Sequence, residues 1–501
     1  MTDSRPPTVL SEQDQDAADT AQLASLGYQQ QLTRALGLWQ NFSVGFTYLS
    51  PLVGVYSLFA YGLATGGPAF VWSIPLVLAG QGLVMLTFSE TASQYPLAGG
   101  IYQWAKRLVG PRYAWLSGWM YTWALLITVA SVAFPIATYA GPLLGYPVNH
   151  TTTVLTAVAV IVLSGAVNLA GVKRLAFAAT AGVVAEVAGT VVLGLYLLLF
   201  HHHHSVSVVG HTMGAGGSGG YLGAFLTAAL FSVWIFFGFE ACGDIAEEVK
   251  NPSRKIPRAM SMTLLVGGVA TVILTLGLLL AVPDLGAVLS GKDTDPVGTV
   301  LSTSLGSVGS KFALALIVLG FVSCTLAIQA ACTRLVYSFA RDGVIAGSRA
   351  LSTLHPKFHM PPGAIAVATL IPAGITLMPS ATVARIITFA VVGIYVGFQS
   401  VVVASLIGRF RGWSPSGAFR LGRWGWAVNL LGLLYGIAAI VVLCLKTPAN
   451  GTGFLDRWLV PLSVGVVLAA GLLYLAIARP REQIRDDARA EATSELLLST
   501  E

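Results

Sequence analysis

The stretch LGAFLTAALFSVWIFFGFEACGDIAEEV, from Leu222 to Val249, decides the fold class. It is apolar enough, and long enough, to cross the ~30 Å hydrocarbon core of a bilayer. Its second half nevertheless carries Gly238, Glu240 and Asp244. A membrane helix does not leave backbone groups unbonded or acids unmatched without a compensating partner. The stretch therefore predicts a membrane span whose helix is interrupted.

The rest of the chain repeats this apolar character. Of its 501 residues, 55% are hydrophobic and only 10% are charged, whereas about a quarter of the residues of a soluble domain are charged. Apolar runs near the length that a bilayer requires recur from end to end. They predict an all-α membrane protein with twelve transmembrane helices, at residues 42–64, 70–88, 113–141, 153–170, 174–200, 222–249, 259–282, 311–339, 362–378, 384–408, 424–445 and 456–478.

The basic residues orient these spans. Twelve spans place both termini on one side, and 23 of the 28 Lys and Arg residues fall on that side. Because Lys and Arg favour cytosolic loops, both termini are predicted to be cytosolic in a multi-pass protein of the cell membrane. We expect a disordered N-terminal tail at 1–35, a membrane domain at 36–479 and a cytosolic C-terminal tail at 480–501. Topology accounts for the net charge of +6, so no nucleic-acid partner is expected.

Two spans contain residues that interrupt a helix. Proline has no amide hydrogen and glycine leaves the helix readily, and such residues occur in spans 1 and 6, five helices apart. Unwound backbone at membrane depth is tolerated where it lines a cavity, and its free amides and carbonyls suit an anion and a cation. The alternative is that both helices are merely kinked. The candidate substrate-binding residues are Ser50, Pro51, Val53 and Gly54 in span 1, and Trp234, Phe236, Phe237, Gly238, Phe239 and Glu240 in span 6.

Other polar residues suggest ion coupling and gating. Glu186 lies inside span 5, where a carboxyl group is costly. It could take and release a proton, or it could be a permanently hydrogen-bonded structural acid. Ser323 and Thr325 in span 8 could supply hydroxyls to a cation, although such residues also bond back to their own helix. Three acids near span ends could form ion pairs of a cytosolic gate or remain solvated charges: Glu90, Glu247 and Glu248.

Several functional classes lack their motifs. No GxxxxGK[ST] loop is present, which argues against ATP-driven transport. No nucleophile, base and orienting group combine as a membrane enzyme requires, and a receptor or structural protein needs neither interrupted helices nor buried acids. The four cysteines form no CxxC pair, so neither a metal nor a cofactor is expected. The expected partners are a small-molecule substrate, a coupling proton or sodium ion and the lipid bilayer; the oligomeric state stays open.

Three motifs resemble the amino acid–polyamine–organocation (APC) superfamily of transporters, in particular its amino acid/choline transporter branch. They are FSETASQYPLAGGIYQWAKRLVG (88–110), FFGFEACGDIAEEVKNPSRKIPRAM (236–260), and RLVY (334–337) followed by ARDG (340–343). The similarity runs from about Leu36 to Arg479. It implies a LeuT-like fold, in which ten core helices form a 5+5 inverted repeat beside two extra helices. It also implies secondary transport by alternating access.

The resemblance also assigns roles to particular residues. In relatives the unwound backbone of spans 1 and 6 meets the carboxyl and amino groups of the substrate, and here these segments are 50–54 and 236–240. Trp234 falls where some relatives have a gating aromatic residue. Glu186 falls where several relatives carry a lysine that replaces a bound sodium ion, and Pro51-Leu-Val-Gly54 departs from the common Gly-Ser-Gly-Ile pattern. These departures leave the coupling ion and the substrate open.

The expected function is therefore secondary transport of an amino acid or a related small amine, such as γ-aminobutyrate or a polyamine. A proton or sodium gradient is expected to drive it. A carrier of choline or another quaternary amine, which would rely on aromatic contacts with the cation, is the alternative within transport. A membrane protein without transport activity is the alternative outside it.

Overall fold

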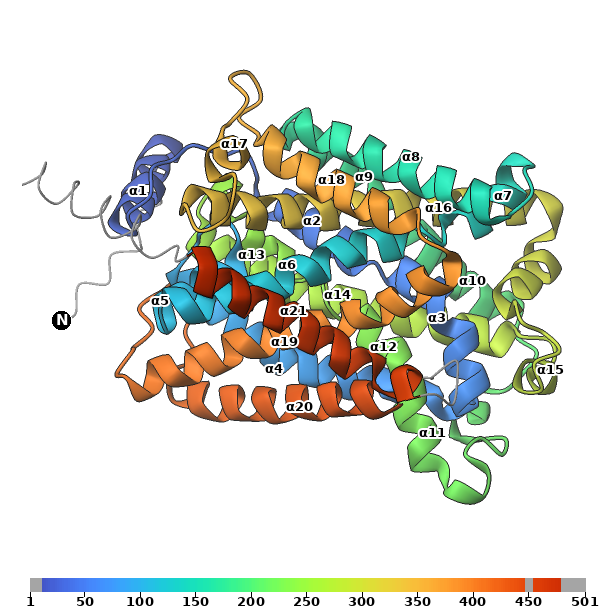
Figure 1. Ribbon diagram of the computed structural model, residues 1–501. Coiled ribbons are helices and arrows are strands. Elements are labelled where there is room, and N and C mark those ends of the chain that lie inside the picture. The colour runs from blue at the N-terminus through green and yellow to red at the C-terminus, as the bar shows by residue number, and fades with distance from the viewer. Residues whose placement is uncertain (1–10, 447–453, 479–501) are drawn as a thin grey trace, which may run out of the picture.

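The computed structural model describes residues 11–446 and 454–478, and this part of the chain is a bundle of helices (Figure 1). The first half comprises α1 (Glu12–Ser25), α2 (Leu38–Leu49), α3 (Pro51–Gly66), α4 (Ser73–Gln94), α5 (Gly100–Leu108), α6 (Pro111–Ala133), α7 (Ile136–Leu144), α8 (His150–Leu169), α9 (Val172–Val187) and α10 (Leu193–Phe200). The second half comprises α11 (Tyr221–Ala228), α12 (Leu230–Ile235), α13 (Ala241–Asp244), α14 (Pro252–Ala281), α15 (Leu285–Leu289), α16 (Pro296–Arg341), α17 (Ser348–Ser352), α18 (Pro362–Thr376), α19 (Ser380–Phe410), α20 (Gly425–Lys446) and α21 (Phe454–Ala478).

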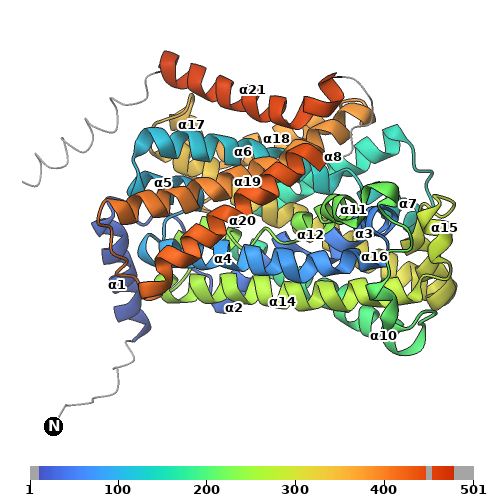
Figure 2. The same cartoon turned by 90° about the horizontal axis from the view of Figure 1, so that it is seen from below.

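Ten helical segments among the described residues are long and apolar enough to cross a membrane. The predicted fold class, an all-helical multi-pass membrane protein, is thus confirmed. At the two other predicted spans, 222–249 and 362–378, the structure has shorter apolar helices, Tyr221–Ile235 and Pro362–Thr376. The first crossing segment, Leu38–Gly66, is the most enclosed, with 89% of its apolar window buried, whereas only 11% is buried in Trp458–Ala478. The segment α2–α3 is therefore enclosed by other helices, whereas α21 lies at the surface of the bundle (Figure 2).

Proline marks where several of these helices begin. The first residue of a helix has no intrahelical use for its amide hydrogen, so proline is tolerated there and its fixed φ suits the helix. Helices α3, α6, α14, α16 and α18 all begin in this way, at Pro51, Pro111, Pro252, Pro296 and Pro362.

The N-terminal segment differs from its prediction. Residues Glu12–Ser25 form α1, whereas the sequence suggested a disordered tail over 1–35. Ser11 caps the helix, and acids in the first turn interact favourably with the helix dipole. The helix is also held to the bundle, because the Asn251 amide donates to the Asp19 carboxylate at 2.7 Å. Residues 1–10 of the predicted tail, and the predicted tail at 480–501, lie outside the described residues.

Candidate functional site

The backbone leaves the helical conformation between α2 and α3. Ser50 separates the two helices and has a left-handed conformation, with φ 41° and ψ 82°. Its hydroxyl oxygen accepts a hydrogen bond from the Val53 amide at 3.1 Å. The first turn of α3 therefore begins inside the bundle, with amide groups that need acceptors.

Glu186 supplies those acceptors from the neighbouring helix α9. One of its carboxylate oxygens accepts the Ser50 hydroxyl, and the other accepts the Leu52 amide at 3.1 Å. The Glu186 side chain is completely buried. An anion at the N-terminus of a helix is favoured by the helix dipole and by the free amides there. Glu186 thus occupies the position at which an interrupted helix would bind an anionic group.

A second irregular segment lies against the first. Residues 236–240 separate α12 from α13, and Gly238 has φ 112°. A Cβ atom at Gly238 would lie 2.6 Å from the Leu49 amide nitrogen, so the two irregular segments are in backbone contact. Helices α3 and α12 also pack closely, because a Cβ atom at Gly54 would lie 2.4 Å from Cγ1 of Ile235. Glycine is required at both positions for this approach.

The Glu240 carboxylate is hydrogen-bonded to two neighbouring groups. Its carboxylate accepts the Gly238 amide at 2.7 Å and the Tyr121 hydroxyl at 2.9 Å. Asp244, one turn further on, is also fully buried, and neither of its carboxylate oxygens has a hydrogen-bond partner among the described residues. An unpartnered buried acid is costly, so a proton or a cation would lower the free energy of this position.

The aromatic candidates divide into two groups. Phe237 contacts Trp234 and Tyr48, with ring centroids 5.8 and 6.1 Å apart, and Trp234 is only partly buried. Phe236 and Phe239 are fully buried, and the Phe239 ring packs against aromatic rings of other helices. Trp234 and Phe237 thus form an aromatic cluster with Tyr48, whereas Phe239 is part of the packed core.

The hydroxyls predicted in span 8 both bond to their own helix, α16. Ser323 donates to the Gly320 carbonyl at 3.0 Å and Thr325 to the Phe321 carbonyl at 2.8 Å. Their oxygens keep free lone pairs. Ser323 also lies against α9, because a Cβ atom at Gly182, one turn before Glu186, would lie 2.5 Å from its Cβ.

All three predicted gate acids are buried in ion pairs. Glu248 pairs with Arg334 through contacts of 2.8 and 3.2 Å, and both side chains are 1% exposed. Glu247 pairs with Arg341 through contacts of 2.8 and 2.9 Å. Glu90 pairs with Arg409 of α19, and its carboxylate also accepts the Leu421 amide. These acids are therefore not freely solvated charges.

A further cluster at this end of the bundle was not predicted. Lys106 of α5 contacts Asp342 at 2.5 Å, and the Tyr28 hydroxyl donates to Asp342 at 2.9 Å. The Arg341 guanidinium lies 4.1 Å from the centre of the Tyr28 ring. Tyr28 thus packs against the Arg341 side chain, and the Ala35 and Leu36 amides donate to the Glu248 carbonyl, so both ends of residues 28–36 contact the ion-paired residues. Asp342 lies in the ARDG motif quoted above, but nothing in the polar N-terminal sequence distinguishes Tyr28.

Burial and charge perturb the titration of this cluster. Burial raises the pKa of the Tyr28 hydroxyl, and the Asp342 carboxylate raises it further. Burial lowers the pKa of Lys106, but Asp342 and Tyr28 together raise it by more, so the net shift is upward. Lys106 therefore remains charged, and Tyr28 neutral, at physiological pH.

Tyr28→Phe is expected to weaken the attachment of residues 11–36 to the bundle. The ring contact with Arg341 remains, but the hydrogen bond to the Asp342 carboxylate is lost, and such bonds are worth about 1.5–3 kcal/mol. Amide hydrogen exchange of this segment should accelerate about tenfold or more, whereas Tyr474→Phe, on α21, should leave it unchanged. Equal exchange in Tyr28→Phe and wild type would contradict the importance of this contact.

Comparison with known proteins gives matches along most of the chain. The family model described as amino acid permease matches residues 36–471. The amino-acid permease BAT1 homolog of Oryza sativa subsp. japonica is 25% identical over 84% of this chain and 86% of its own length. An uncharacterized amino-acid permease of Schizosaccharomyces pombe is 26% identical over 95% of this chain and 88% of its own length. The choline transporter of Saccharomyces cerevisiae is 24% identical over 82% of this chain and 75% of its own length.

Proposed function

Because the chain belongs to the amino acid permease family, we propose that it is a secondary active transporter for an amino acid or a related small amine. The substrate crosses the cell membrane by alternating access, driven by a proton or sodium gradient. The proposed architecture has twelve spans in a LeuT-like 5+5 inverted repeat plus two extra helices, with spans 1 and 6 broken and both termini cytosolic. The ten crossing segments and the two shorter apolar helices support this number of spans.

The contact between Glu186 and the first turn of α3 carries the proposal. A substrate carboxylate would bind the same groups that Glu186 now holds, the Ser50 hydroxyl and the Leu52 amide. The two anions therefore compete for one site. Protonation of Glu186 removes its negative charge and weakens its hold on these donors. Uptake of a proton would thus release the site for the substrate, which couples the two bound species.

The remaining candidates have supporting roles in this proposal. Backbone groups of 50–54 and of 236–240 bind the substrate, and Trp234 closes over it. Ser323 and Thr325, which have free oxygen lone pairs, would bind a sodium ion if sodium is the coupling ion. The ion pairs of Glu90, Glu247 and Glu248 form the cytosolic gate, and opening toward the cytosol requires at least some of them to separate.

One observation favours choline or another quaternary amine as the second candidate. Glu186 already accepts the Leu52 amide at the start of α3, so a substrate that has no carboxylate would not have to displace it. Trp234, Phe237 and Tyr48 lie together beside the irregular segments, and aromatic faces attract such cations.

Glu186→Gln tests the coupling directly. Glutamine keeps an acceptor oxygen for the amide of α3 but cannot ionise. Purified variant in liposomes should lose accumulation driven by a proton gradient yet retain exchange of substrate across the membrane. Glu12→Gln is the matched control, because the Glu12 side chain is 91% exposed and surface ion pairs contribute little. Unchanged accumulation and unchanged pH and sodium dependence in Glu186→Gln would rule out the coupling role.

A further inference from the structure

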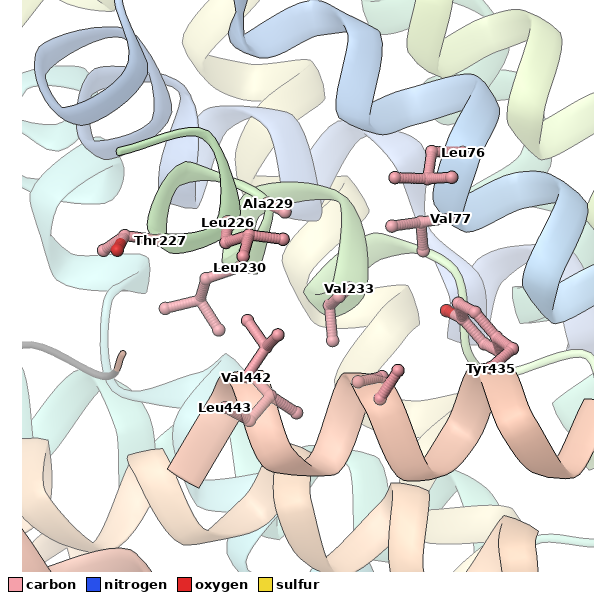
Figure 3. Close-up of a pocket in the computed structure, with 12 residues that line it drawn as sticks. Leu76, Val77, Leu226, Thr227, Ala229, Leu230, Val233, Tyr435, Val442 and Leu443 are labelled. Carbon is pink, nitrogen blue, oxygen red and sulfur yellow. The ribbon is translucent and has the colours of Figure 1, made fainter. Parts of the chain in front are cut away.

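A pocket of about 200 Å³ lies between α4, α11, α12 and α20. Ten of its twelve lining residues are aliphatic; the others are Thr227 and Tyr435. Figure 3 shows side chains of α4 and α20 facing those of α11 and α12 across the cavity. Apolar cavities of about 150 Å³ exclude water and bind small apolar molecules. The apolar lining of this pocket therefore suits a hydrocarbon ligand.

The surroundings of the pocket supply such a ligand. Helices α4 and α20 belong to segments that cross the membrane. Leu76, which lines the pocket, is 55% exposed. On α20, Leu434 and Ile437 are adjacent in sequence to the lining residues Tyr435 and Ala438, and they are 57% and 49% exposed. In a bilayer these side chains contact lipid tails. The pocket is thus continuous with the lipid-facing surface, and the molecules at its opening are acyl chains.

We propose that this pocket binds one acyl chain of a membrane phospholipid and that the bound chain holds α12 in position. Leu230 and Val233 of α12 line the pocket, while Ile235 of the same helix packs against Gly54 of α3. Helix α12 ends at Ile235, directly before the irregular segment 236–240. A chain in the pocket therefore supports α12 from the side away from α3.

Photo-crosslinking tests the proposal without any transport assay. The full-length protein is reconstituted in phosphatidylcholine liposomes that contain a trace of phosphatidylcholine with a diazirine in the middle of one acyl chain. After illumination, labelled peptides are identified by mass spectrometry. Labelling is expected to concentrate on the pocket-lining parts of α4, α11, α12 and α20, several-fold above the lipid-facing surfaces of α8 and α10. Because the readout is lipid binding, it is independent of the proposed substrate transport.

Variants that fill the pocket make the test specific. Ala439→Phe places a ring in the cavity and should reduce labelling of the pocket peptides several-fold. Ala427→Phe, at an exposed alanine of α20 outside the pocket, should leave labelling as in wild type. If Ala439→Phe does not fold, Ala438→Phe replaces it, because Ala438 also lines the pocket. Uniform labelling of all lipid-facing helices, or undiminished labelling in the filled variant, would each overturn the proposal.

Discussion

Arg334→Met is expected to destabilise the protein by about 3–5 kcal/mol, because it leaves Glu248 as an unpaired charge in the interior. Both partners are 1% exposed in the native ion pair. Arg334 also donates to the Asn168 side chain at 3.3 Å, so the substitution removes this hydrogen bond as well. The loss should appear as a lower midpoint of thermal unfolding in detergent, whereas Lys173→Met, at an exposed position, should change it little.

The double variant Arg334→Met/Glu248→Met distinguishes the loss of stability caused by an unpaired charge from the loss caused by altered packing. Replacing both members of a buried ion pair by apolar side chains is often neutral for stability. The double variant should therefore recover most of the stability that Arg334→Met loses. Transport should still be impaired, because the proposed gate lacks one of its ion pairs. If the double variant is as unstable as the single one, the loss arises from packing and not from the unpaired carboxylate.

Gly238→Ala is expected to abolish most transport. The φ of 112° at Gly238 is one that L-residues rarely adopt, and the new Cβ would meet backbone atoms of Leu49 at 2.6 and 2.8 Å. Backbone strain of this kind costs about 1–3 kcal/mol, and backbone atoms cannot rotate away as a side chain can. The population of the present conformation should thus fall roughly ten- to a hundredfold, with a comparable loss in the rate of substrate uptake.

A second glycine-to-alanine variant tests whether the loss of transport is specific to Gly238. A Cβ atom at Gly82 in α4 would have no neighbouring element within 4 Å, and alanine favours the helix. Gly82→Ala should therefore transport as well as wild type at equal protein abundance in the membrane. Wild-type uptake by Gly238→Ala would contradict the view that close contact between the two irregular segments matters for function.

Much of the architecture follows from apolar runs alone. Their lengths predict the membrane-crossing segments, whereas the prolines at which several helices begin were identified only in the structure. The resemblance read from the motifs at 88–110 and 236–260 is confirmed by the family match over residues 36–471. Hydropathy alone does not register where hydrogen bonding within a helix ends. The polar and glycine residues Gly238, Glu240 and Asp244 are what predicted an interruption within 222–249, where the structure has the shorter apolar helix Tyr221–Ile235.

The contacts of the site were less predictable. Glu186 is an obvious buried acid in the sequence, but its bond to Ser50 joins residues 136 positions apart and depends on how α9 packs on α2. The gate acids posed the same difficulty, since a charge near a span end is solvated or paired depending on its tertiary neighbours. Helix α1 was missed because its polar composition is also that of a disordered tail, while its fixed position comes from contacts such as that of Asp19 with the Asn251 amide.

The most direct measurement is uptake by the purified protein in liposomes. Labelled amino acids, γ-aminobutyrate, putrescine and choline are offered one at a time, with and without imposed proton and sodium gradients. We predict accumulation of at least one of these compounds above its equilibrium level, only when one of the two gradients is present. If folded protein accumulates none of them under any gradient, the assignment as a secondary transporter of amino acids or small amines is contradicted.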